Sequence, residues 1–227
     1  MVQIKVNIAN RKNYGNERKL NTIKYIVIHY TANDGDHDES NANYFKNRIV
    51  QASAHYFVDG DSITQSVLDN YVAYSVGGAK WADCPKTGGG KYYNVCTNNN
   101  SISVELCDEV KNGKSDFTEA TLKNAAELVK MLMQKYNVDS DHVIRHFDVN
   151  GKHCPKPFMT DVKAWEAFKK RLEGYTVEKL NIVVDGKKHE VNRVLVGQNN
   201  FIKIRDIAPL LGYDVDSIKG VVTLTKK

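Results

Sequence analysis

The sequence predicts an α/β domain built on a mixed central β-sheet with flanking helices, followed by a small α+β module. Three observations lead to this prediction. Short, β-rich apolar runs alternate irregularly with segments of helical periodicity, one clear hairpin lies among these runs, and the composition changes after Gly174. The 227 residues are enough for one well-cored domain and a small second one. We therefore expect two domains, residues 1–174 and 175–227.

The predicted strands are short and apolar. The run IKYIVIHYTA (23–32) is typical of a buried central strand, which we expect to end at His29. Residues 52–67 predict a hairpin with the turn DGD, because residues alternate in character on either side of it. Residues 100–107 and 142–147 are predicted as two further strands.

Three segments have the apolar spacing of helices. The strongest is 117–138, for which Thr118 is the expected N-cap. Its apolar stripe consists of Leu122, Ala125, Ala126, Val129, Leu132, Met133 and Tyr136. Residues 38–49 and 160–174 are predicted as the other two, the last with Thr160 as its cap and Gly174 as its end. Their expected inward residues are Tyr44, Phe45 and Ile49 in the former and Val162, Trp165, Phe168 and Leu172 in the latter.

Composition excludes several classes of partner. The chain is 41% hydrophobic and 26% charged, which is typical of an ordinary globular protein. No apolar run approaches the length of a membrane span, so no membrane partner is expected. The net charge is +5, but the basic residues are interleaved with acidic ones and form no Lys/Arg block. No nucleic-acid partner is therefore expected.

The N-terminal segment MVQIKVNIANRKNYGN lacks the apolar stretch and cleavage site of a signal peptide. We therefore expect synthesis in the cytoplasm, and any action outside the cell needs another exit route. The four cysteines are too few for a disulfide scaffold. Cys84 and Cys96 flank a loop and could pair, but a reducing compartment argues for free thiols.

The segment HFDVNGKHCPKP (146–157) is rich in nucleophilic and metal-binding side chains. Zinc prefers imidazole and thiolate ligands, and catalytic sites use three protein ligands and one open position. His146 and Cys154 are close enough in sequence for a loop to bring both to one ion. His29 is the best third candidate, because it ends a rigid buried strand. The alternative interpretation is a capped loop with a buried thiol.

The remaining histidines are expected to lie outside this site. They are His37 in a polar loop, His55 in the hairpin as a core or supporting residue, His142 at a helix-to-strand connection, His153 pointing away, and His189 in the second module.

Residues 20–173 resemble the zinc-dependent N-acetylmuramoyl-L-alanine amidases of type 2, which share a fold with peptidoglycan recognition proteins and amidase-type phage lysins. The matching segments are YIVIHYTA, ASAHYFVDG, NSISVELC and RHFDVNGKHCPKP, in the order typical of the family. The most specific is H-x-D-V-x-G-K-x-C-P. The resemblance implies Zn²⁺ on His29, His146 and Cys154, and it makes Glu105 and Lys152 the catalytic pair.

These residue types suit amide hydrolysis. A zinc-bound water has a pKa near about 7. The carboxylate of Glu105 can accept a proton from water and pass it to the leaving amine. The ammonium of Lys152 can stabilise a developing oxyanion. The alternatives are a surface charge on an edge strand for Glu105, a solvated loop lysine for Lys152, and either a ligand-supporting or a capping role for Asp148.

Two positions depart from the pattern of many relatives. Ala54 stands where they have a tyrosine, just before the hairpin histidine, and Ser75 is the nearest match where some have a histidine. If the family's tyrosine contributes to catalysis, this chain must rely on Glu105 instead.

The second module, 175–227, resembles the small repeat near the N-terminus of some copper amine oxidases, which also occurs in many clostridial surface proteins. The matching text is VDGKKHEVNRVLVGQNNFIKIRDIAPLLGYDV, and the resemblance implies no copper ligands. Its position after a lytic domain favours cell-wall binding, and the alternative is a dimerising or stabilising module.

The predicted function is hydrolysis of bacterial peptidoglycan between N-acetylmuramic acid and L-alanine, as a phage endolysin or a bacterial autolysin. Such an enzyme would act on the wall after release by a holin or by lysis. The alternatives are a non-catalytic peptidoglycan-binding protein of the same fold and a zinc peptidase acting on another wall bond. Cys154 favours catalysis, because the non-lytic relatives commonly lack the cysteine ligand.

Residues 77–100 are rich in Gly and Asn and carry Trp81, Tyr92 and Tyr93. A connection this long inside a compact domain is usually functional or mobile. We expect it to form a mobile wall of the substrate groove, with aromatic faces for sugar or peptide. The alternative is an insertion without a contact role.

Overall fold

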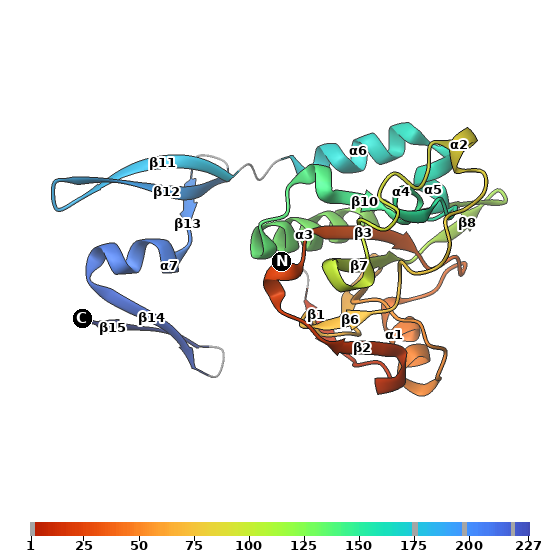
Figure 1. Ribbon diagram of the computed structural model, residues 1–227, viewed down its shortest axis with the longest axis horizontal. Coiled ribbons are helices and arrows are strands. Elements are labelled where there is room, and N and C mark those ends of the chain that lie inside the picture. Colours follow the sequence, from red (N-terminus) through yellow and green to blue (C-terminus); the bar gives the residue numbers. More distant parts are fainter. Residues whose placement is uncertain (1–2, 174–176, 197–198, 219–220) are drawn as a thin grey trace. The chain divides into compact units, whose positions relative to one another are not determined.

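The computed structural model describes residues 3–173, 177–196, 199–218 and 221–227. The chain divides into two compact units, Met1–Leu172 and Glu173–Lys227 (Figure 1). None of the helices in the described ranges is long and apolar enough to cross a bilayer.

The first unit is built on a six-stranded sheet in the order β1-β5-β4-β7-β3-β10. Its strands are β1 (Ile4–Val6), β3 (Tyr25–Tyr30), β4 (Tyr56–Val58), β5 (Ile63–Gln65), β7 (Ser101–Leu106) and β10 (Val143–Arg145). The β4–β5 pair is antiparallel, and the other neighbours are parallel. The predicted mixed central sheet with flanking helices is therefore confirmed.

Alternation along the strands separates two hydrophobic layers. Ile26 and Ile28 of β3 belong to the large core cluster, together with residues of α3 (Glu119–Tyr136) and α6 (Val162–Leu172). Tyr25 and Val27 point the other way, into a second cluster that includes Val149. Val149 belongs to the short helix α4 (His146–Asn150). By the same alternation His29 points toward the α4 side of the sheet.

Helix α3 follows its predicted pattern. Thr118 caps it, because its hydroxyl accepts a hydrogen bond from the Thr121 amide. Ala125, Ala126, Val129 and Leu132 are buried. The other members of the predicted stripe, Leu122, Met133 and Tyr136, are partly buried against the same core.

The helix predicted over 38–49 starts where expected but ends two residues earlier. α1 spans Asp38–Asn47, and it buries Asp38 and Ala42, whereas Tyr44 and Ile49 are exposed. Asp38 belongs in the interior because Ser62 and Thr64 donate hydrogen bonds to its carboxylate.

The predicted helix 160–174 corresponds to α6, which starts only at Val162, and a separate short helix, α5 (Lys156–Thr160), precedes it. The predicted end at Gly174 lies outside the described residues. Thr160 ends α5 instead of capping α6. The Asp161 carboxylate takes the capping role by accepting from the Ala164 amide, and Val162 is 57% exposed.

Several small elements of the first unit have no recognisable signal in the sequence. These are β2 (Tyr14–Glu17) paired with β6 (Tyr71–Ala73), the hairpin β8 (Glu109–Lys111) with β9 (Lys114–Asp116), and the single-turn helix α2 (Cys84–Thr87). They are too short to show a hydrophobic period.

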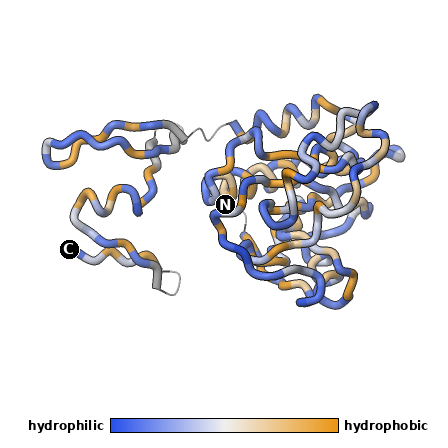
Figure 2. The backbone as a smooth tube through the Cα atoms, viewed as in Figure 1, coloured by the Kyte–Doolittle hydropathy of each residue, from blue (hydrophilic) through white to orange (hydrophobic). Residues whose placement is uncertain are grey.

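The second unit contains two separate sheets. Its elements are β11 (Val177–Val184), β12 (Lys187–Val196), β13 (Asn199–Ile202), α7 (Ile204–Ile207), β14 (Tyr213–Ile218) and β15 (Val221–Lys226). The β11–β12 hairpin turns at Asp185 and Gly186, which both have positive φ, as a two-residue turn requires. Both hydrophobic and hydrophilic residues occur along these two strands, without strict alternation (Figure 2). Where side-chain burial is described in this unit, Val191 and Ala208 are its buried hydrophobic residues.

Candidate metal centre and active site

His29, His146 and Cys154 come together at one end of the central sheet. One ligand atom from each lies within 4.8 Å of the others. The Cys154 Sγ atom is 3.8 Å from Nδ1 of His29, and the rings of His29 and His146 are 4.6 Å apart between centroids. These are the three residues that the sequence predicted as ligands.

The backbone explains how residues so far apart in sequence converge. β10 lies parallel to β3 with Arg145 opposite Ile28, so His146 follows directly beside His29. The strand predicted over 142–147 ends at Arg145, and His146 starts α4 instead. The chain then turns back, and the amide of Phe147 donates to the Cys154 carbonyl over 2.8 Å. This bond holds the cysteine at the first turn of α4, next to His146.

The chemistry of the three side chains fits a zinc ion. All three are buried, with 2–3% of their surface exposed. Nε2 of His29 and both ring nitrogens of His146 are buried and have no hydrogen-bond partner among the described residues. Buried polar atoms almost always have partners, so these orphaned nitrogens indicate a ligand. A tetrahedral site of imidazoles and thiolate suits zinc.

Burial also sets the protonation of these groups. It lowers the pKa of His146 to about 3, with a smaller contribution from the positive charge of Lys152. It lowers the pKa of His29 well below its usual value and raises the pKa of the Cys154 thiol. Both imidazoles are therefore neutral at pH 7, as metal ligands must be. The thiol must lose its proton when a metal binds.

Glu105 lies beside the cluster on the neighbouring strand. β7 pairs with β3 in parallel register with Glu105 opposite His29, so both side chains point to the same face. Its Oε1 atom is 3.8 Å from Nδ1 of His29, and its Oε2 atom is buried without a partner. Burial raises the pKa of Glu105 to about 8, although the charge of Lys152 opposes this shift. A bound cation would lower this pKa again.

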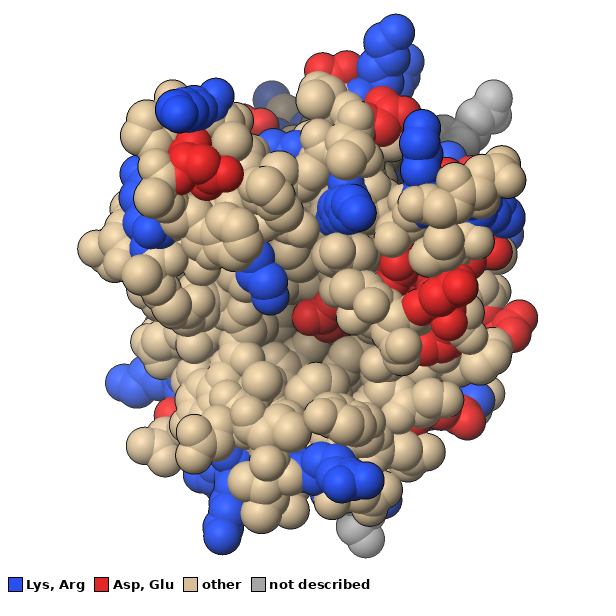
Figure 3. Space-filling model, turned by 90° about the vertical axis from the view of Figure 1, so that its right-hand side faces the viewer, with Lys and Arg blue, Asp and Glu red and all other residues tan. Residues whose placement is uncertain are grey.

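Lys152 completes the set of predicted site residues. It is exposed, and it lines an open groove of about 430 Å³ together with His146. The other lining residues are Gln51, Tyr74, Ser75, Gly77, Gly78, Ala79, Trp81, Asn98 and Asn150. Figure 3 shows a face of the molecule that is hollowed near its middle, with acidic side chains inside the hollow and along one flank.

The four remaining histidines of the first unit have other partners. His55 is buried and lies 3.1 Å from both the Ser103 hydroxyl and the Tyr71 carbonyl, which makes it a core residue. His153 points away from the cluster, as expected, and pairs with Asp83 and the ring of Trp81. His37 and His142 pair with Asp59 and Asp139.

Asp148 does not contact the histidine ligands through any hydrogen bond that the described residues make. Its carboxylate accepts from the Arg145 amide and pairs with the Arg145 guanidinium. It therefore has the capping role, one of the two that the sequence left open. Cys84 and Cys96 are buried free thiols and do not pair.

The loop 77–100 is held against α4 by backbone hydrogen bonds, which argues against the mobile wall we expected. The amides of Trp81, Gly90 and Tyr92 donate to carbonyl groups of α4 over 2.8–2.9 Å. Tyr92 packs edge-on against Tyr25 and lies outside the groove, whereas Trp81 is 43% exposed and lines it.

Gly151 shows how closely this loop packs on α4. Its φ is +89°, and a Cβ atom at this position would lie 2.2 Å from the Sγ atom of Cys84. Only glycine fits here, which explains the glycine of the HFDVNGKHCPKP segment.

Trp81→Ala is expected to raise KM for soluble muropeptides about three- to tenfold, because one aromatic contact contributes about 0.5–1.5 kcal/mol. Zinc content should not change. The exposed aromatic Tyr44 on α1 is a matched control, since Tyr44→Ala removes a similar surface away from the groove. An unchanged KM for Trp81→Ala would exclude the contact.

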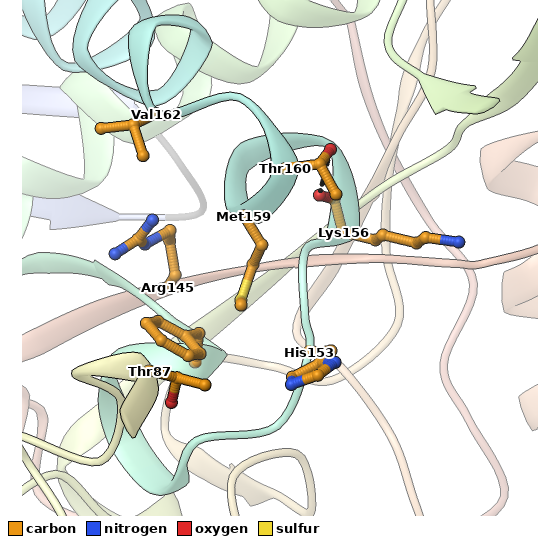
Figure 4. Close-up of a pocket in the computed structure, with 8 residues that line it drawn as sticks. Thr87, Arg145, His153, Lys156, Met159, Thr160 and Val162 are labelled. Carbon is orange, nitrogen blue, oxygen red and sulfur yellow. Dashed lines mark hydrogen bonds between the residues drawn. The ribbon is translucent and has the colours of Figure 1, made fainter. Parts of the chain in front are cut away.

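A second cavity has a volume of about 480 Å³. It is lined by Thr87, Arg145, Phe147, His153, Lys156, Met159, Thr160 and Val162 (Figure 4). The three candidate metal ligands are not among its lining residues. The Arg145 guanidinium is already engaged by Asp148 and by the Phe158 carbonyl. This cavity is therefore separate from the candidate centre.

Sequence reasoning missed the polar residues that shape the groove. Gln51, Tyr74 and Asn98 come from segments without a recognisable pattern. Asn150 was visible inside the HFDVNGKHCPKP segment, and its place between His146 and Lys152 was the signal that could have found it.

Comparison with known proteins agrees with this geometry. A probable N-acetylmuramoyl-L-alanine amidase of Bacillus licheniformis is 35% identical over 159 residues, which is 68% of this chain and 42% of that protein. The amidase BlyA of Bacillus subtilis is 34% identical over 161 residues, with the same two coverages. The chain thus spans less than half the length of these curated relatives.

Solved structures show the same fold. A mutant endolysin from Bacillus subtilis superposes with a TM-score of 0.58 at 29% identity, covering 76% of this chain and 99% of that one. The catalytic domain of XlyA, an amidase of Bacillus subtilis, gives a TM-score of 0.57 at 28% identity, covering 75% and 99%. Residues 19–157 match the family described as N-acetylmuramoyl-L-alanine amidase. This chain belongs to that amidase family.

Proposed function

We propose that this protein is a zinc-dependent peptidoglycan amidase that cleaves the bond between the lactyl group of N-acetylmuramic acid and L-alanine. The observation that carries the proposal is the buried His29, His146 and Cys154 cluster, with orphaned imidazole nitrogens next to an unpartnered Glu105 oxygen. The family match and the amidase names of the relatives support the bond and the substrate.

His29, His146 and Cys154 would hold the ion, which supplies an activated water and polarises the scissile carbonyl. Glu105 is the proposed proton carrier. It accepts a proton from the attacking water and donates it to the amine of L-alanine as the bond breaks. The same carboxylate therefore acts first as the base and then as the acid. Its position next to His29, with only 20% of the side chain exposed, favours this role over that of a surface charge.

Lys152 is the proposed stabiliser of negative charge. Lys152 lines the groove together with His146, and its charge affects the pKa of His29, His146 and Glu105. A cation at this place can donate a hydrogen bond to the carbonyl oxygen as charge develops on it. The groove that leads away past Trp81 would hold the glycan or the stem peptide.

Digestion of purified cell walls tests the proposal. Cleavage at this bond releases stem peptides with a free N-terminal alanine and leaves the lactyl carboxylate on the glycan, and mass spectrometry identifies both products. Muropeptides bound but recovered intact would indicate a non-catalytic binding protein. Peptides cut at another bond would indicate a zinc peptidase.

We propose further that residues 175–227 bind the cell wall and that the protein acts on the wall after release from the cell. A fragment of residues 1–174 should then cleave small muropeptides at the full-length rate but lyse whole cells at least about tenfold more slowly. Tethering raises the effective concentration only for a substrate that is a surface.

Two measurements check this division of labour. The module fused to a fluorescent reporter should label susceptible cells, and sedimentation should show the same oligomeric state for the fragment 1–174 and for the full-length protein. If the full-length protein is a dimer that dissociates on truncation, and small-substrate activity falls with lysis, the module is an assembly element instead.

A further inference from the structure

Asn150 connects three parts of the candidate active site. It is the last residue of α4, and His146 is the first, so the two lie one helical turn apart on the same face. Both line the groove. The side chain is 3% exposed and lies between Lys152 and the groove wall.

Each end of the Asn150 carboxamide has a partner. Its Oδ1 atom accepts from the amide of Lys152 over 3.0 Å. Its Nδ2 atom donates to the Gly77 carbonyl over 3.2 Å. The backbone carbonyl of Asn150 also accepts from the amide of Trp81 over 2.8 Å. One residue therefore holds the backbone of the proposed charge stabiliser and two points of the groove wall.

The hydrogen bond from the Lys152 amide to Asn150 restrains the backbone just after α4 ends. Lys152 follows Gly151, which has a positive φ and no side chain, so the α4 helix cannot fix the direction of the chain at Lys152. The Oδ1 contact restrains the backbone where the helix no longer does. A long, exposed lysine side chain reaches a defined point only if its backbone is held.

From this geometry we propose that Asn150 is a positioning residue, which orients Lys152 over the candidate metal centre and fixes the groove wall at Gly77. The proposal rests on the proposed amidase function, because it acts through the proposed role of Lys152. Asn150 itself touches no reacting atom.

The test is a double-mutant cycle on soluble muropeptides. Asn150→Ala should keep zinc and lower kcat about 10- to 100-fold, as is typical when a group that orients a catalytic side chain is removed. The loss of kcat should largely disappear in the Lys152→Ala background, because no lysine is left to position. If Asn150 has a purely structural role, the kcat losses caused by Asn150→Ala and by Lys152→Ala should instead multiply in the double variant.

Asn124→Ala is the matched control. Asn124 is a similarly buried asparagine on α3, and its Nδ2 atom donates to the Asp59 carbonyl over 2.9 Å, away from the groove. It should lower the unfolding temperature without lowering kcat at a temperature where the protein is folded.

A second variant covers the case in which Asn150→Ala does not fold. Asn150→Asp keeps the oxygen that accepts from the Lys152 amide but cannot donate to Gly77. It should keep kcat within about threefold and raise KM, since only the wall contact is lost.

The failures are distinguishable. An Asn150→Ala enzyme with wild-type kcat, or losses that multiply fully in the cycle, would overturn the positioning role while the amidase function stands. A wild-type protein that releases no N-terminal alanine would overturn the proposed function itself.

Discussion

Glu105→Gln is expected to keep its zinc and fold but to lose kcat by about a hundredfold or more, because the amide that replaces the carboxylate cannot accept a proton from water. The substitution conserves volume, so the packing of β7 against β3 and β4 should survive. The loss should appear in kcat far more than in KM, since the proton moves only as the bond breaks. Steady-state kinetics on a defined muropeptide, with metal analysis of the same preparation, measures both.

Glu109→Gln provides the control for a change of charge. Glu109 is a half-buried carboxylate on β8, and its recorded ion-pair partner is Lys111. It should keep the wild-type rate. If Glu105→Gln lyses cell walls at a near wild-type rate, Glu105 is not the proton carrier.

Cys154→Ser is expected to weaken zinc binding by more than about a hundredfold and to abolish amidase activity. Removing a group that only supports a metal ligand costs 10- to 100-fold, and removing the ligand itself should cost more. The replacement removes a soft thiolate donor and leaves two imidazoles. Metal analysis after dialysis against a chelator, together with the unfolding temperature with and without zinc, measures the effect.

Cys107→Ser is the matched control, since Cys107 is also a buried free thiol near the same end of the sheet. Its unfolding temperature should still rise when zinc is added. Stoichiometric zinc in the Cys154→Ser protein, and in a His146→Ala, Cys154→Ala double variant, would contradict the assignment.

Zinc affinity should also depend on pH, with a sign that follows from the site. Burial raises the pKa of the Cys154 thiol, so the metal-free protein holds this proton at neutral pH and binding must release it. Lower pH favours the protonated thiol, so the apparent affinity should fall as pH falls. Titration calorimetry in buffers of different ionisation enthalpy would detect the released proton.

The three candidate metal ligands could be singled out from the sequence because they lie in recognisable segments. His29 lies in a continuous apolar strand, which ends at Tyr30 and not at His29 as expected, and His146 and Cys154 lie in one compact segment with a specific pattern. The long helix α3 was also predictable, since its buried positions recur over 18 residues. The spacing of apolar residues within one strand or helix shows which of its faces is buried, so such elements can be predicted from the sequence.

Other features depended on partners distant in sequence. Asp38 is buried on α1 because Ser62 and Thr64 donate hydrogen bonds to its carboxylate. The spacing of apolar residues along the helix cannot show these contacts. Thr160 looked like a helix cap, but α5 occupies that position and Asp161 caps α6 instead.

By itself the sequence determined the fold class, the resemblance to the amidases and the residues able to bind zinc. Only the tertiary structure decided that Glu105 lies beside His29, that the loop 77–100 is held against α4, and that Asn150 links Lys152 to the groove wall. The physical reason is that the type of each side chain and the periodicity of apolar residues are local properties of the sequence. Strand register and the partners of buried polar groups are set by contacts between segments far apart in sequence.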